Sequence, residues 1–205
     1  MLVFLNLDAV PVDSLWLHRM TGPLLRPGRF AAVQGGIREL PSREDVFYWH
    51  SCGPRFYFAS ASSSWIASHG GIGFSTVNAA LRREAWEALP FGWAPILEDK
   101  KWQAAALESG LEILDLPEAA VFHSHTYDLV TLWRRAASEG FGWRLVGVEY
   151  PPGKMMRDLF HRQTLKHWFV GLIRGELDSG AERLFPWVRP LALYWGNRWS
   201  RDVAL

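Results

Sequence analysis

Short apolar runs and longer periodic stretches alternate along the first two thirds of this chain. Residues 2–5 form a continuous apolar run that ends at Asn6, which predicts a fully buried strand in the middle of a sheet. Related patterns predict strands at residues 30–37, 111–116 and 119–122. Strands that alternate with helical patterns in this way predict an α/β fold.

Helical patterns fill the segments between and after these strands. Asp13 is a suitable cap for the first helix, and Gly22-Pro23 is expected to break the chain after it. The segment 41–73 has no clear period and is rich in serine, glycine and aromatic residues, which predicts a functional loop such as a lid or a substrate wall. The predicted helices cover residues 13–20, 79–89, 98–109, 127–139 and much of 154–200.

These patterns predict an α/β domain over residues 1–149 and a helical tail over residues 150–205. The first part has 13 Lys and Arg against 16 Asp and Glu, whereas the second has 9 against 5. A basic tail that also carries aromatic residues suits peripheral contact with an anionic membrane surface, although a solvated helical face has the same composition.

The bulk composition excludes several classes of protein. A formal net charge of +1 gives no reason to expect nucleic acid as a partner. No apolar run is long enough to span a bilayer, so we do not expect an integral membrane protein. Cys52 is the only cysteine, which excludes an intrachain disulfide. A chain without disulfides favours a location in the reducing cytoplasm, where any membrane contact would be at the inner face of the membrane.

Three groups of polar residues have the chemistry of a catalytic site. Asp8 follows the first strand, where open α/β sheets place ligand-binding carboxylates, although an aspartate that merely forms a turn is the commoner case. Glu98 and Asp99 open a predicted helix, whose dipole stabilises their charge. An ionised carboxylate there can accept a proton, but acids favour first turns in any case. His123 and His125 are two residues apart on a predicted strand, which suits joint metal ligation as well as a structural role.

Four segments, in this order and at this spacing, resemble the later part of the family-two glycosyltransferases, and most closely the bacterial rhamnosyltransferase-like members. The resemblance covers roughly residues 2–145. The segments are residues 4–17 (FLNLDAVPVDSLWL), 74–91 (FSTVNAALRREAWEALPF), 96–125 (ILEDKKWQAAALESGLEILDLPEAAVFHSH) and 132–140 (LWRRAASEG).

The resemblance implies that residues 1–149 are the C-terminal part of a GT-A domain, a nucleotide-binding α/β fold. It also implies an inverting glycosyltransferase that uses a nucleotide-diphospho-sugar donor of the rhamnose type. The acceptor would be a hydroxyl of a glycan or of a lipid-linked molecule, in surface polysaccharide or lipid-linked glycan synthesis.

The resemblance further implies roles for individual residues in catalysis. Asp99 would be the base that deprotonates the acceptor hydroxyl, with Glu98 in support. Asn78 and Arg82 lie in the segment that shapes the pocket for the donor sugar and the acceptor.

The implied metal is Mg²⁺ or Mn²⁺, held by residues from both ends of the resembling region. Asp8 would end a DxD-like motif, and His123 or His125 would complete the site. Asn6 stands where this motif has its first carboxylate, so an amide, which is a weaker ligand, faces the donor there.

One departure from the family concerns the sheet. The family's N-terminal strands and helices, which hold the nucleotide base and ribose, have no counterpart in this sequence. An open sheet edge is therefore expected, covered by an oligomer contact or by a partner chain. One other function stays open, a truncated, non-catalytic glycosyltransferase-like remnant or accessory subunit. A metal-dependent hydrolase built on the histidines is disfavoured, because the sequence has no further histidine or carboxylate at close ligand spacing.

Overall fold

The structure is a computed structural model that describes residues 1–38, 60–123, 125, 127–177 and 179–199. The chain divides into two compact units. Unit 1 comprises Met1–Leu40 and Ile66–Ser124, and unit 2 comprises Pro41–Trp65 and His125–Leu205. The predicted change of structure at residue 150 falls inside unit 2, between two of its helices.

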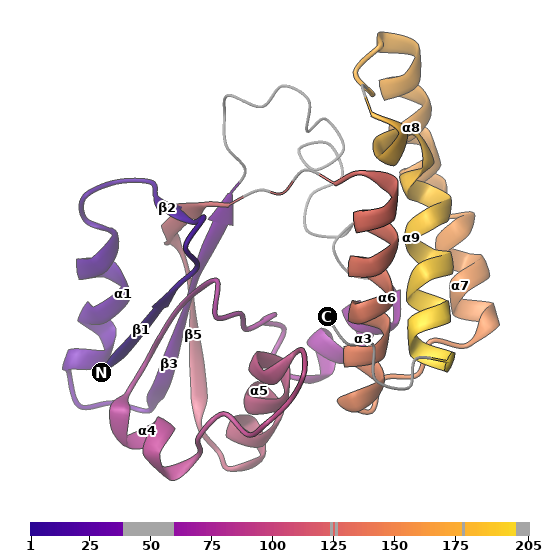
Figure 1. Ribbon diagram of the computed structural model, residues 1–205. Helices are drawn as coiled ribbons and strands as arrows, with labels where there is room; N and C mark the ends of the chain where they lie inside the picture. Colours follow the sequence, from indigo (N-terminus) through magenta and orange to yellow (C-terminus); the bar gives the residue numbers. More distant parts are fainter. Residues whose placement is uncertain (39–59, 124, 126, 178, 200–205) are drawn as a thin grey trace. The chain divides into compact units, whose positions relative to one another are not determined.

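Unit 1 is built on a mixed five-stranded sheet with flanking helices (Figure 1), which confirms the predicted α/β class. Its strands follow the order β1-β4-β3-β5-β2, in which β3 and β5 are parallel and the other neighbours are antiparallel. The strands are β1 (Leu2–Leu5), β2 (Val10–Pro11), β3 (Phe30–Arg38), β4 (Asn78–Leu81) and β5 (Glu112–Phe122).

The first strand lies at an edge of this sheet. Val3 and Leu5 are 40% and 39% exposed, so β1 is covered on one face only. The predicted strand is therefore confirmed, whereas its predicted place in the middle of the sheet is wrong. A continuous apolar run does not distinguish these places, because the neighbours of a strand are set by distant segments. Among the described residues β1 pairs only with β4, which fits the expected open edge.

Two helices cover the two faces of the sheet. On one face, α1 (Trp16–Leu25) buries Trp16, Met20 and Leu24 against Val33 and Ala80. On the other, α5 (Glu98–Glu108) packs Trp102 and Ala106 against Ala32, Ala79 and Leu81. Adjacent residues of β3 and β4 thus belong to opposite cores, as the two-residue period of a strand requires.

The helix α1 continues through Gly22 and Pro23, so the predicted break after Met20 is wrong. Pro23 removes one backbone hydrogen bond and glycine weakens a helix. The burial of Trp16, Met20 and Leu24, spaced four residues apart on one face, outweighs this cost.

Residues 79–81 form a strand, and the helix predicted over 79–89 begins only with α4 (Arg83–Ala88). Ala79, Ala80 and Leu81 are fully buried, because β4 has a paired strand on each side. Small alanines suit both a helix and a crowded central strand, so the local pattern misled the prediction.

The two strands predicted at 111–116 and 119–122 are one strand, β5, which continues through Pro117. Its pairing with β3 is irregular between Gly35 and Ile37, where β5 carries extra residues. The helix predicted at 98–109 and the strand predicted at 30–37 are confirmed as α5 and β3.

The segment predicted to be an irregular loop, 41–73, contains a helix, α3 (Ser60–Ser68). That part of the prediction is wrong. Residues 69–73 are irregular as predicted, and residues 41–59 of the proposed lid lie outside the described residues.

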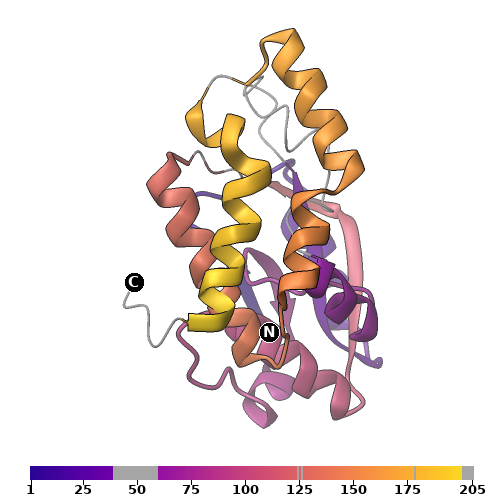
Figure 2. The ribbon, with the colours of Figure 1, turned by 90° about the vertical axis from the view of Figure 1, so that its right-hand side faces the viewer.

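Unit 2 is helical, as predicted for 127–139 and 154–200. In Figure 2, α6 and α9 run side by side and α7 lies next to α9. Its core includes Leu132, Leu177, Ala181 and Phe185. The helices are α6 (Leu129–Leu145), α7 (Pro152–Leu159), α8 (Arg162–Arg174) and α9 (Gly180–Trp199).

The solvent side of α8 carries three large apolar residues, Phe169, Leu172 and Ile173, which are 55%, 42% and 70% exposed. Contact between this helix and a membrane surface stays a prediction. In the described part of the chain, no helix has the length and the apolar character that a bilayer crossing needs.

Candidate metal centre

A short strand pairing brings Asp8 beside His123. Val10 of β2 pairs with Phe122 of β5, and the two strands are antiparallel. In that register the residues just before Val10 lie opposite those just after Phe122. A turn closed by a hydrogen bond from the Ala9 N–H to the Asn6 carbonyl sets the position of Asp8.

His123 is held firmly at this point. Its backbone N–H donates to the carbonyl of Arg38, which extends the β3–β5 pairing by one residue. Its side chain is 7% exposed, and Nε2 lies 3.2 Å from Oδ1 of Asp8. The amide Nδ2 of Asn6 lies 3.5 Å from the same ring nitrogen. Asn6 therefore lies beside one of the predicted metal ligands, and its role in donor binding stays a prediction.

His125 completes a group of three ligands. Asp8, His123 and His125 each offer one ligand atom, and these atoms all lie within 4.8 Å of one another. This spacing lets one ion bind all three with small side-chain movements. Two imidazoles and one carboxylate suit Mn²⁺ and other transition metals better than Mg²⁺, which prefers oxygen ligands. The residues thus fit the expected divalent metal, with Mn²⁺ the better match of the two predicted ions.

We expect the chain to bind one Mn²⁺. His123→Ala should lower the Mn²⁺ affinity at least about 10–100-fold, because removing a residue that only hydrogen-bonds to a metal ligand already lowers affinity by that factor. Calorimetric titration measures the stoichiometry and the loss of affinity.

His18→Ala is the matched control, because His18 is exposed on α1 and belongs to no ligand group of the described residues. Equal Mn²⁺ affinity for the two variants would contradict the assignment of His123.

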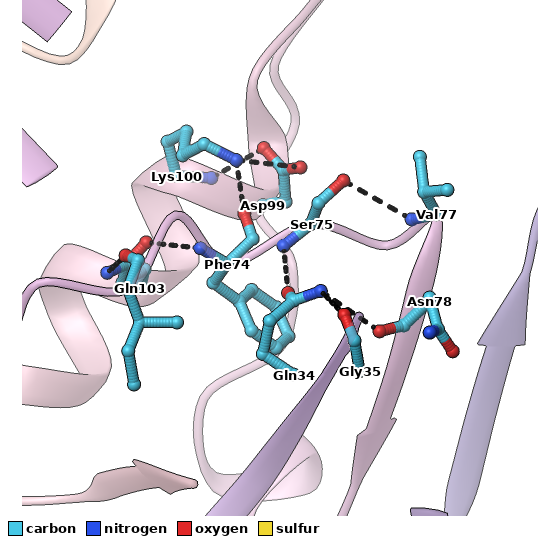
Figure 3. A network of polar contacts seen from close by, with 10 residues as sticks. Gln34, Gly35, Phe74, Ser75, Val77, Asn78, Asp99, Lys100 and Gln103 are labelled. Carbon is cyan, nitrogen blue, oxygen red and sulfur yellow. Dashed lines mark hydrogen bonds and ion pairs between the residues drawn. The ribbon is translucent and has the colours of Figure 1, made fainter. Parts of the chain in front are cut away.

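Asp99 lies at the start of α5, in a different group of polar contacts (Figure 3). It is 8% exposed, and its Oδ1 accepts a hydrogen bond of 2.7 Å from the Lys100 N–H. The Lys100 ammonium lies 3.3 Å from Oδ2 and also donates to the carbonyl of Phe74. The buried Lys100 ammonium therefore forms an ion pair with the Asp99 carboxylate. Glu98, the neighbouring residue, is half-buried.

The residue before this pair has an unusual backbone. Leu97 has φ 58° and is the only non-glycine residue with positive φ in the described part of the chain. Such a conformation is unfavourable for a side chain with a Cβ and often occurs near functional sites. It fixes the direction in which α5 begins and thereby the direction of Glu98 and Asp99.

The segment 74–78 connects this acidic pair with the end of β1. Lys100 contacts its first residue, Phe74, whereas the Asn6 N–H donates to Val77 near its other end. Lys100, the partner of Asp99, and the Asn6–Asp8 turn therefore contact the same short segment of unit 1 from its two ends. No contact joins Asp99 directly to Asp8 or His123 among the described residues.

Two buried glutamines fix this segment, and neither was among the residues selected from the sequence. Gln34 accepts from the Ser75 N–H at 2.6 Å and donates to the Asn78 carbonyl at 3.1 Å (Figure 3). Gln103 accepts from the Phe74 N–H at 3.0 Å and is fully buried. The position of Gln103, one helical turn after Asp99, was the available signal.

The two residues expected to shape the donor pocket lie at opposite ends of β4. Asn78 pairs with Leu5, close to the metal centre, but its buried amide accepts from the Trp16 indole and donates to the carbonyls of Gly36 and Ala119. Arg82 follows the other end and donates to the carbonyls of Phe30 and Arg26. Both side chains support the sheet, and a role in ligand binding stays a prediction for each.

No protein-family model matches this sequence, and no curated protein matches it either.

Proposed function

We propose that this chain is a metal-dependent, inverting glycosyltransferase whose sheet is part of a GT-A fold. The observation that carries the proposal is the gathering of Asp8, His123 and His125 at the ends of β1 and β5. The carboxyl ends of strands are where open α/β sheets bind nucleotides. The four resembling segments supply the reaction type.

The proposed chemistry divides between the two polar groups of the structure. Asp8, His123 and His125 would hold the divalent ion, which supplies positive charge to offset that on a departing diphosphate. Asn6, beside His123, is placed to donate a hydrogen bond to the same diphosphate. Asp99, with Lys100 next to it, accepts the proton of the acceptor hydroxyl, and Glu98 supports it.

The donor in this proposal is a nucleotide-diphospho-sugar whose sugar is rhamnose or a related hexose. The acceptor is a hydroxyl of a glycan or of a lipid-linked molecule. We place the reaction in the cytoplasm at the inner face of the membrane, where the exposed side of α8 would meet anionic lipid. The free edge of β1 would be covered by a second copy or by a partner chain.

Binding of a nucleoside diphosphate tests the proposal most directly. We expect the chain to bind UDP, GDP or dTDP in the presence of Mn²⁺ and to lose most of this affinity when the metal is removed with a chelator. His123→Ala should bind the same nucleotide at least about 10-fold more weakly, since the ion bridges protein and diphosphate. Calorimetry with and without Mn²⁺ measures both.

The His18→Ala variant again serves as the control and should bind as the unaltered chain does. Binding of Mn²⁺ without binding of any of the three nucleotides would contradict glycosyl transfer by this chain. That result would instead support a non-catalytic remnant or accessory subunit.

A further inference from the structure

Unit 2 has a cavity that the proposed reaction does not use. Its volume is about 520 Å³, within the range of about 300–1,000 Å³ that is typical of small-molecule sites. Residues from α3, α7, α9 and the start of α8 line it, and none of them is a proposed metal ligand.

One part of the cavity wall is apolar and comes from α9. Phe185, Pro186, Pro190 and Leu193 form it. The rings of the two prolines add apolar carbon surface to this stretch of the helix. Such a wall favours an alkyl chain over a polar group.

The polar part of the wall contains one carboxylate, and that carboxylate is already engaged. Oδ2 of Asp158 accepts a hydrogen bond of 2.7 Å from the Tyr150 hydroxyl and one of 2.9 Å from the Ser60 N–H. Burial, and then the hydrogen bond to Asp158, raises the pKa of Tyr150 above its usual range, so the hydroxyl stays a donor to the carboxylate.

The cations of the cavity differ in their partners. Arg189 is buried and forms an ion pair of 2.8 Å with Glu139. Arg157 is exposed at the cavity, and no described residue forms a salt bridge or hydrogen bond with it. His161 and Gln163 add polar atoms near the start of α8. Arg157 is therefore the group best placed to receive an anion from outside.

We propose that this cavity binds one molecule of an acidic amphiphile, with its alkyl chain on the α9 wall and its phosphate or carboxylate at Arg157. The combination of an apolar wall with a single uncommitted guanidinium carries the inference. It goes beyond the proposed glycosyl transfer and does not rest on it, because all lining residues belong to unit 2.

Calorimetric titration of the full chain, without metal or nucleotide, tests this site. Dodecyl phosphate, kept below its critical micelle concentration, should bind with one molecule per chain. Dodecyl maltoside and inorganic phosphate should each bind at least about 10-fold more weakly, because each lacks one of the two interactions. Inorganic phosphate that binds as tightly as dodecyl phosphate would overturn the proposal, and so would no binding of dodecyl phosphate.

Two pairs of matched variants locate the binding. Arg157→Gln should weaken dodecyl phosphate about 10-fold, whereas Arg162→Gln, an exposed cation outside the cavity, should leave it unchanged. Ser63→Trp should obstruct the cavity, whereas Ser64→Trp, at the exposed neighbouring position of α3 that does not line the cavity, should not. Equal effects within each pair would show that binding is non-specific and would overturn the assignment of the site.

Discussion

Gly196→Leu should lose about 3 kcal/mol or more of the free energy of unfolding, because it forces a side chain into backbone that cannot move aside. A Cβ at residue 196 would lie 2.6 Å from the carbonyl carbon of Ala137 on α6. Gly140 is the reciprocal contact, because its Cβ would lie 2.9 Å from the carbonyl carbon of Leu193 on α9. The two helices can approach this closely only where both lack side chains, and α6 and α9 form the largest helix–helix contact of unit 2.

Urea unfolding followed by circular dichroism measures this loss. The matched control is Gly153→Leu, which introduces the same side chain into a helix, α7, where nothing lies within 4 Å. That variant should be neutral or gain up to about 1 kcal/mol from better helix propensity. Similar midpoints for the Gly196 and Gly153 variants would contradict the close packing of α6 on α9.

The sequence was sufficient to predict those elements whose type and ends depend on local residues. The strand β3 and the helix α5 have the predicted type and nearly the predicted bounds, because an apolar run opens β3 and Gly110 marks the end of the helical segment of α5. The sequence was insufficient where contacts with a distant segment decide whether residues form a strand or a helix. Ala79–Leu81 became a central strand because β1 and β3 pair on its two sides. Gly22-Pro23 stayed inside a helix because Trp16, Met20 and Leu24 of that helix are buried against the sheet.

The candidate site divides in the same way. The residues Asp8, His123 and His125 were chosen from the sequence by chemistry, and the structure brings them together. The reason is the β2–β5 pairing, and β2 has only two residues, which no periodic pattern reveals. The ion pair between Asp99 and the buried Lys100 was not predicted either. A lysine next to an aspartate in the sequence is usually a pair on the protein surface, and the sequence does not reveal that this pair is buried.

Asp99→Asn should abolish sugar transfer, with a loss of turnover of about 10²–10⁴-fold, because asparagine cannot accept the proton of the acceptor hydroxyl. Turnover is measured as nucleoside diphosphate released from UDP-, GDP- and dTDP-sugars in the presence of Mn²⁺. Mn²⁺ and nucleotide binding should remain, since no described contact joins Asp99 to the metal ligands. Asp115→Asn, an exposed acid on β5, is the control and should retain turnover.

The buried Lys100 makes it necessary to separate catalysis from stability. Asp99→Asn leaves the Lys100 ammonium without its carboxylate, which alone should cost about 3 kcal/mol of stability. The double variant Asp99→Asn/Lys100→Gln removes the unpaired charge and should regain much of this loss. A base at position 99 predicts that the double variant is stable and still inactive. If it regains turnover together with stability, Asp99 acts only through the ion pair, and the base must be another residue.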